Sequence, residues 1–174
     1  MAEQKMEYFR KEFQFTGKHA RMAGELWVLN DSKNSYFRRL IDLYILAPII
    51  GFRLNRKAEA DNSDGDIKSV FPEQILRERD KLEFIMQMIL MLEYTDEKDY
   101  KSCVNLAFRE PETIEEFQRY YKLFHDYVRG GVEELYERLV VRRSELDEVY
   151  KEEKSANIVA LLERFGEIEY INQL

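Results

Sequence analysis

An acidic loop, DNSDGD at positions 61–66, holds the residue types that best fit a metal ion. Carboxylate and backbone oxygens are the ligands that Ca²⁺ prefers, and an EF-hand loop also needs a glutamate at its twelfth position. Placing Gly65 at the sixth position puts Phe71 at the twelfth, so the EF-hand pattern fails. The alternatives are a plain solvated loop or an irregular cation site formed by three acids, Asp61, Asp64 and Asp66.

Cys103 is the only cysteine of the sequence, and His19 and His125 are the only histidines. Neither the short ligand spacings of a zinc site nor the repeated Glu-x-x-His of a di-iron bundle occurs. A catalytic Cys–His pair would require the fold to join residues that are distant in the sequence. We therefore expect no catalytic residue, metal ion or cofactor, and we expect His125 to lie half-buried beside a carboxylate. A single cysteine cannot form an internal disulfide, which favours a cytoplasmic location.

Two acids, Asp42 and Glu83, lie in the most apolar segments of the chain. If these segments pack together, a pair of carboxylates could perform general acid–base chemistry, which is the basis of an enzyme hypothesis. The competing interpretation is a network of arginines and carboxylates that fixes the register of two helices.

The Gly130-Gly131 pair has one property of an anion site, because free backbone N–H groups at a helix start bind anions. The residues that follow include two glutamates, at 133 and 134, whose negative charge would repel an anion. Glycine also interrupts helices. We therefore interpret Gly130-Gly131 as a hinge between two helices.

Five basic residues flank the apolar stretch Leu40–Phe52 and could clamp phosphate groups, which gives a nucleic-acid-binding hypothesis. The first 60 residues carry 11 basic and 7 acidic side chains, whereas the rest carry 16 and 27. This asymmetry fits equally well two oppositely charged parts that pack together. The net charge of −7 and the lack of a recognisable nucleic-acid-binding motif argue against nucleic acid. The basic cluster comprises Arg38, Arg39, Arg53, Arg56 and Lys57.

The elements that must position these residues are helices. Only three prolines and seven glycines occur, and good helix formers are abundant, so the composition favours an all-α fold. The chain length fits one domain, 1–174, and the apolar spacing predicts an irregular bundle of six to eight helices. Two apolar helices, at about 36–54 and 72–94, should lie at its centre. The polar segment 55–71 should be a mobile internal loop, and 167–174 a flexible tail.

The helix at 36–54 has too few consecutive apolar residues to cross a membrane. A spanning helix needs about 20 of them, whereas Asp42 interrupts the apolar run. We therefore expect a buried core helix, kinked or broken near Leu46 because Pro48 removes a backbone donor. Two short helices that meet at Pro48 are the alternative to one bent helix. Further helices are predicted at 3–14, 17–29, 97–109 and 113–129, and Thr113 with Glu116 forms a capping box. The segment 132–165 should form one or two helices that break near Ser144 or Ser155.

The eleven tyrosines and eleven phenylalanines exceed what a small helical core needs, so some should form an exposed patch for protein–protein contact. The sequence therefore predicts a non-catalytic interaction or assembly protein, either a homo-oligomer or a subunit of a larger complex. Its partner would be another protein or a second copy. Nucleic-acid binding by residues 38–57 and a carboxylate-based enzyme are the alternatives. The predicted partner-binding residues are Arg38, Arg39, Asp42, Arg53, Arg56, Lys57, Tyr120 and Tyr121.

Overall fold

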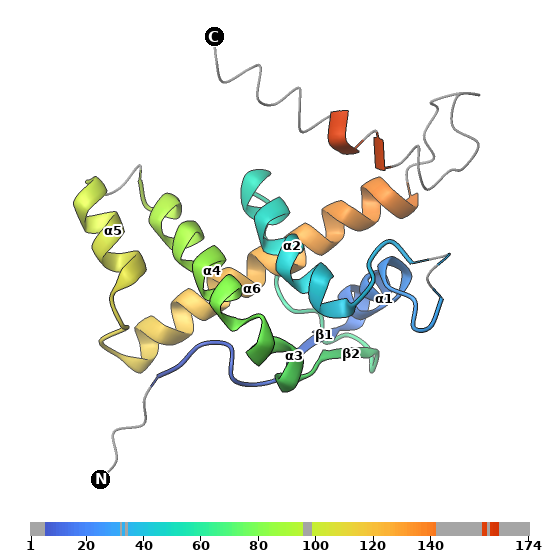
Figure 1. The fold of residues 1–174 in the computed structure, drawn as a ribbon, viewed down its shortest axis with the longest axis horizontal. Helices are drawn as coiled ribbons and strands as arrows, with labels where there is room; N and C mark the ends of the chain where they lie inside the picture. Colours follow the sequence, from blue (N-terminus) through green and yellow to red (C-terminus); the bar gives the residue numbers. More distant parts are fainter. Residues whose placement is uncertain are drawn as a thin grey trace.

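Two long helices cross at the centre of the fold. The computed structural model describes residues 6–31, 33, 35–95, 99–141, 158–159 and 161–163. Helix α2 (Leu40–Arg53) packs across α6 (Ile114–Tyr136), and this pair makes the most extensive contact between elements (Figure 1). Seven helices and one two-stranded sheet occur in the described residues, so the prediction of a helical bundle is confirmed.

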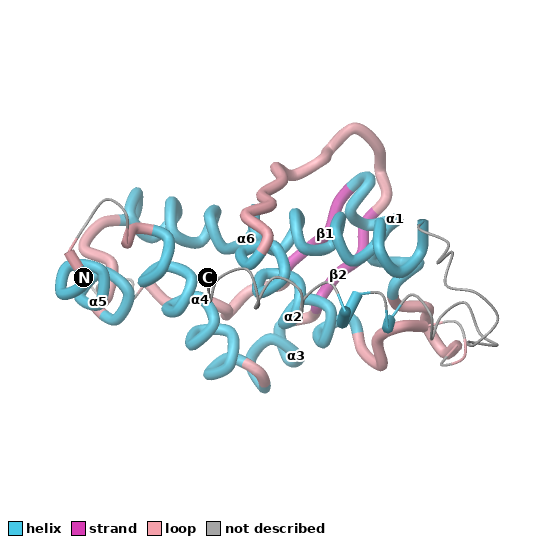
Figure 2. Tube along the Cα trace, turned by 90° about the horizontal axis from the view of Figure 1, so that it is seen from above, coloured by secondary structure: helices cyan, strands magenta, loops and turns pink. Residues whose placement is uncertain are grey.

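The other elements surround this crossing (Figure 2). α5 (Tyr100–Phe108) lies at one end of the molecule and packs against α4 (Arg79–Glu93), whereas α1 (Gly17–Leu26) and the sheet lie at the other. A short helix, α3 (Pro72–Arg77), leads into α4, and a π-helix, η1 (Glu137–Val141), continues α6. No helix in the described residues is both long enough and apolar enough to cross a membrane.

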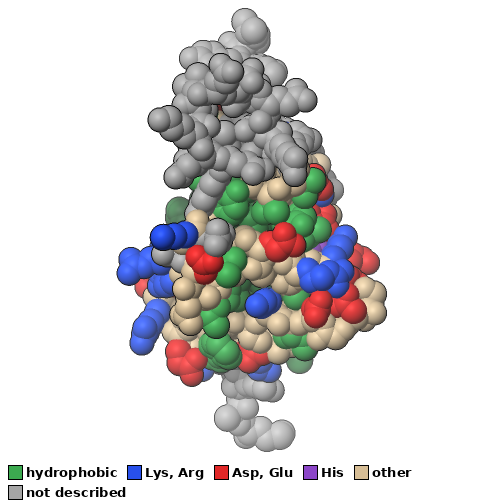
Figure 3. All heavy atoms as spheres, turned by 90° about the vertical axis from the view of Figure 1, so that its right-hand side faces the viewer, with side chains coloured by type: hydrophobic (Ala, Val, Ile, Leu, Met, Phe, Trp, Pro, Cys, Tyr) green, Lys and Arg blue, Asp and Glu red, His purple; other side chains and the backbone are tan. Residues whose placement is uncertain are grey.

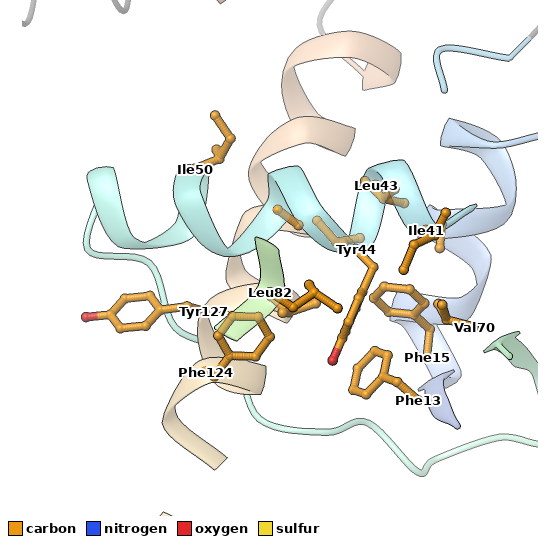
Figure 4. Packing of buried hydrophobic residues seen from close by; sticks show 14 of the residues in the cluster. Phe13, Phe15, Ile41, Leu43, Tyr44, Ile50, Val70, Leu82, Phe124 and Tyr127 are labelled. Atoms are coloured by element: carbon orange, nitrogen blue, oxygen red, sulfur yellow. The ribbon is translucent and has the colours of Figure 1, made fainter. Parts of the chain in front are cut away.

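Aromatic and aliphatic side chains from α1, α2, α4, α6 and the sheet form the core, part of which is seen in Figure 4. Tyr44 of α2 is fully buried, and its ring centroid lies 4.8 Å from that of Phe13 and 6.0 Å from that of Phe124. Such tilted and edge-on ring pairs stabilise a core beyond the area that they bury. Pro48 lies inside α2, which continues to Arg53, so the central helix predicted at 36–54 is present as one helix.

Glycines allow the backbones of α2 and α6 to touch. A Cβ atom on Gly131 would overlap the carbonyl group of Ala47, and one on Gly130 would overlap the carbonyl group of Arg56. The hinge predicted at these two glycines is wrong, because α6 runs through both of them to Tyr136. Close packing against α2 compensates for their low helix propensity.

A two-stranded antiparallel sheet occupies part of the segment that was expected to be a loop. β1 (Phe13–Thr16) pairs with β2 (Ile67–Val70), in the register that places Phe13 opposite Val70. The segment 55–71 is therefore not entirely a loop. Its last residues form a strand because Val70 is fully buried in the core and its neighbours pair with β1.

Two helix predictions need correction. In the described part of 3–14 no helix forms, since residues 13–14 are extended and Phe9 has a φ of +56°, outside the right-handed helical region. The helix predicted at 72–94 divides into α3 and α4 at Glu78. This residue leaves the helical conformation, with a ψ of 11°, and its carboxylate binds Arg39 at the start of α2.

The remaining helix starts agree better with the prediction. The helices expected at 17–29 and 97–109 are α1 and α5, and the hydroxyl of Thr113 accepts the N–H of Glu116 at 3.1 Å, as expected for a cap. Most of the helix predicted at 132–165, and the whole tail at 167–174, lie outside the described residues.

Candidate functional site

Four residues form a continuous stripe on the outside of α2, which we call the outer stripe: Asp42, Leu46, Ile49 and Arg53. Their spacings of four, three and four residues place them within about 60° of the helix circumference. Leu46 and Ile49 are 36% and 44% exposed, whereas Tyr44 on the opposite side is fully buried. An exposed apolar pair between an acid and a base has the composition of a protein contact surface.

Arg39 fixes the acidic end of the outer stripe. Its guanidinium donates to Asp42 at 2.6 Å and to Glu78 at 3.0 Å, and its backbone N–H donates to Asp42 at 3.1 Å. These charge-assisted bonds raise the pKa of Arg39. Lys81 binds Glu78 at 2.7 Å, so the four side chains balance in charge. Asp42 thus caps α2 while 32% of its side chain stays exposed.

Arg53 at the other end of the outer stripe has no such partner. In the part of the chain that the structure describes, its exposed side chain makes no hydrogen bond or ion pair. Its positive charge stabilises the C-terminal end of α2 through the helix dipole. Arg38 from the predicted cluster is also exposed, and it borders a hollow lined by Trp27 and Phe37. Arg53 is therefore available to an external acid.

Arg56, by contrast, is used inside the fold. It donates to Glu134 and Glu137 at 2.9 Å and to Glu133 at 3.1 Å. Burial opposes the ionisation of Glu133, but hydrogen bonds from its basic neighbours, Lys18 foremost, outweigh burial and lower the pKa of this carboxyl. Arg56 therefore ties the chain that leaves α2 to the second half of α6.

Lys57, Tyr120 and Tyr121 also have partners inside the protein. Lys57 forms an ion pair with Glu93 and lies over the ring of a tyrosine on α6. Tyr120 is buried, and its hydroxyl donates to Glu116 at 2.7 Å. Tyr121 is half-buried against the core. These three side chains contribute to the fold. Asp42 and Arg53 are the two predicted partner-binding residues that belong to the outer stripe.

The structure gives the two acids of the enzyme hypothesis, Asp42 and Glu83, different partners. Glu83 accepts a hydrogen bond from Arg79 at 2.7 Å, and Asp42 accepts from Arg39. Both carboxylates are about one-third exposed, so neither has the desolvated surroundings that tune a catalytic acid. Arg39 joins Asp42 to Glu78 at the boundary of α3 and α4, whereas the pair of Glu83 with Arg79 lies within α4.

In the acidic loop 61–66 the carboxylates bind donors of the protein itself. Arg21 of α1 bridges Asp64 and Asp66, and Asp61 accepts the backbone N–H of Lys18 at 2.8 Å. Among the described residues, no group of three or more metal-ligating side chains is positioned to hold an ion. The arrangement ties the loop to α1.

Both histidines are buried, and each has a polar partner. His125 stacks on Phe13, with ring centroids 4.4 Å apart, and its Nε2 lies 2.8 Å from the hydroxyl of Tyr44. Burial lowers the pKa of His125 to about 3, so the ring is neutral and pairs with this hydroxyl in place of the predicted carboxylate. His19 lies 3.0 Å from Glu133, and burial lowers the pKa of His19 as well.

A hollow of about 190 Å³ lies between α4, α5 and residues 6–8. Its lining includes the apolar side chains of Met86 and Leu90 and the charged side chain of Arg109, which pairs with Glu116 at 2.6 Å. Ligand pockets usually begin at about 300 Å³. The hollow is therefore smaller than a site for an organic cofactor.

Charges of both signs mix on the surface. On the end of the molecule seen in Figure 3, Lys and Arg side chains lie among Asp and Glu side chains. The basic cluster is divided in the same way, since only Arg38 and Arg53 of its five members have no carboxylate partner in the described part of the chain. Two separate cations release few counterions from a nucleic acid.

Comparison with protein-family models, curated proteins and solved structures gave no match. The outer stripe must therefore be judged on its own geometry. The sequence predicted a buried core helix at 36–54, so the exposure of Leu46 and Ile49 was not expected. The symmetrical spacing between Asp42 and Arg53 is the one signal of this site in the sequence. It indicates a surface only when the structure has shown which side of α2 is buried.

Proposed function

We propose that this protein is a non-catalytic interaction or assembly protein that binds another protein chain through the outer stripe of α2. The observation that carries the proposal is the exposure of Leu46 and Ile49 in the middle of the most apolar helix. Removing apolar surface from water is favourable by about 25 cal/mol per Å². A partner that covers these side chains therefore gains free energy that the isolated chain does not.

Helix α4 extends the proposed contact surface. A stable interface buries about 800 Å² on each partner, which is more than four side chains supply. α4 packs against α2 and exposes Phe84 and Leu92, of which Phe84 is 58% exposed. The outer stripe supplies the centre of the surface, and α4 supplies additional apolar area.

The surroundings of the other polar groups support contact over chemistry. The ion-paired acids and bases of α6 and of the chain that follows α2, such as Glu133 and Arg56, stabilise the fold. Within the described residues, the nucleic-acid alternative keeps only Arg38 and Arg53 as cations of its cluster that have no carboxylate partner. A cytoplasmic location remains part of the proposal, and the single buried cysteine, Cys103, supports it.

The test compares a variant of the outer stripe with a matched control. The variant Leu46→Glu/Ile49→Glu places charge at the centre of the stripe, and Leu76→Glu/Ile114→Glu places the same charge on exposed residues of α3 and α6. Molar mass is measured by sedimentation over a range of concentrations, and any co-purifying protein is tested as a purified pair with each variant.

We expect the stripe variant to lose self-association, or to bind its direct partner with an affinity lower by at least about tenfold, because burying an unpaired carboxylate is costly. The control should behave as the original protein. A protein that shows neither self-association nor a direct partner sensitive to the stripe variant would not work by this surface.

A further inference from the structure

The spacings between the residues of the outer stripe are the same in both directions along α2. The spacings from Asp42 to Leu46, from Leu46 to Ile49 and from Ile49 to Arg53 are four, three and four residues. Reversing the helix therefore exchanges Leu46 with Ile49, two apolar residues of equal volume, and exchanges Asp42 with Arg53, two opposite charges. A surface with this property is complementary to its own copy after a two-fold rotation.

We infer that the outer stripe joins two copies of this chain into an antiparallel α2–α2 dimer. This inference rests on the proposed function and names the second copy as the partner. In the dimer, Leu46 of one copy packs on Ile49 of the other, and Arg53 of one copy lies beside Asp42 of the other. Both contacts occur twice, once on each side of the axis, as an isologous interface requires.

Electrostatics favours the antiparallel arrangement over the parallel one. Asp42 and Arg53 are 11 residues apart, which corresponds to about 16 Å along a helix. An antiparallel pair brings each charge to its opposite, whereas a parallel pair would place Asp42 on Asp42 and Arg53 on Arg53. The dipoles of two antiparallel helices also attract each other.

The two ends of the stripe suit this pairing. Arg39 already holds the carboxylate of Asp42 in place, and the remaining exposed part of the carboxylate can accept a further cation. Arg53 has no competing acid among the described residues. Arg39 and Lys81 balance the charges of Asp42 and Glu78, so this end of the stripe attracts Arg53 only modestly. The charged contacts therefore set the direction of pairing, and the apolar centre supplies most of the affinity.

The expected dimer is weak because its central contact is small. We expect a dissociation constant on the order of 10 µM, as is usual for interfaces at the low end of the size range. The first measurement is sedimentation equilibrium of the whole chain from about 1 to 500 µM. A monomer mass over this entire range would overturn the inference. If another protein binds the original chain but not the variant Leu46→Glu/Ile49→Glu, the proposed function would still hold.

Charge reversal tests the pairing of Asp42 with Arg53. Arg53→Glu places two acids at each end of a self-pair, and Asp42→Lys places two bases there. Each variant alone should dimerise at least about tenfold more weakly, and an equimolar mixture of the two should form a heterodimer near the original strength. Failure of the mixture to recover, with both variants folded by circular dichroism, would overturn the inference.

Disulfide trapping tests the same geometry without changing the cap at Asp42. One chain carries Leu46→Cys and the other Ile49→Cys, and the native Cys103 is buried, so the unmodified chain is the control. Under mild oxidation we expect the mixed 46–49 disulfide to exceed the 46–46 and 49–49 products. A dominant 46–46 and 49–49 pattern would indicate parallel helices and contradict the antiparallel dimer.

Discussion

The inner side of α2 packs against α6, whereas its outer side is exposed. On the inner side, a Cβ atom on Gly51 would overlap the backbone of Tyr127, so the two helices are in backbone contact there. On the outer side, Leu46 and Ile49 are exposed to solvent in the described structure. The inner side fixes the fold of one chain, and the outer side has the composition of a surface that another chain covers.

The same contrast separates two arginines that are three residues apart. Arg56 binds Glu133, Glu134 and Glu137, whereas Arg53 makes no ion pair among the described residues. Helix α2 ends at Arg53, and the chain then turns at Asn55 and brings Arg56 to the glutamates at the end of α6 and in η1. The end of the helix therefore decides which of the two positive charges stabilises the fold and which remains available for contact.

The largest effect on stability should come from adding a side chain where α2 and α6 touch. Gly131→Ala places a methyl group on the carbonyl of Ala47 and should lower the free energy of unfolding by roughly 4 kcal/mol, measured by urea denaturation. In an ordinary helix the same change stabilises by up to about 1 kcal/mol. Gly65→Ala is the control, since no atom lies within 4 Å of its added Cβ. A stabilised Gly131→Ala would contradict the close crossing.

The next effect should come from the buried glutamates. Arg56→Met removes the cation that Glu133, Glu134 and Glu137 share, while Lys18 and Arg138 keep their own pairs, and it should destabilise the fold by roughly 2 kcal/mol. The matched change Arg53→Met should alter the free energy of unfolding by less than about 0.5 kcal/mol, because an exposed, unpaired arginine contributes little. Equal losses in the two variants would remove the distinction between these arginines.

The pH dependence of stability should report on His125. The pKa of His125 is about 6.5 in the unfolded chain and about 3 in the fold. Above pH about 6.5 the ring is neutral in both states. Below this pH the unfolded chain takes up a proton that the fold does not, so stability falls as pH decreases towards about 3. The slope from His125 is at most about 1.4 kcal/mol per pH unit.

The variant His125→Phe isolates this contribution. It should be less stable at neutral pH, because the hydroxyl of Tyr44 loses its ring partner. Between pH 6 and 4, however, its unfolding free energy should fall less steeply than that of the original protein. Carboxylates titrate similarly in both proteins, so the difference in slope belongs to the histidine. Identical slopes would show that His125 titrates normally in the fold.

The sequence predicted the features that local chemistry determines. The apolar run after Arg39 indicated α2, and Thr113 with Glu116 marked the start of α6. Hydrophobic periodicity and capping are short-range signals, so they survive in a single sequence. The pairing of Asp42 with an arginine one turn earlier was predictable for the same reason.

The features that the sequence did not reveal depend on distant partners. Glycine indicates a break when only local propensity counts, but Gly130 and Gly131 lie in α6 because α2 and the chain that follows it pack on them. The glutamate partners of Arg56 lie 77 or more residues away in the chain. The spacing of Phe9 and Phe13 suggested a helix, whereas Phe13 belongs to a strand whose partner is β2.

The measurement that tests the central claim most directly is the stability of the monomer with a charged outer stripe. In dilute solution, where no complex forms, the unfolding free energy of Leu46→Glu/Ile49→Glu should differ from that of the original protein by less than about 1 kcal/mol. Leu43→Glu, at a fully buried position of the same helix, should not fold. If the stripe variant instead loses more than about 3 kcal/mol, its leucine and isoleucine belong to the core of the single chain, and α2 has no face reserved for a partner.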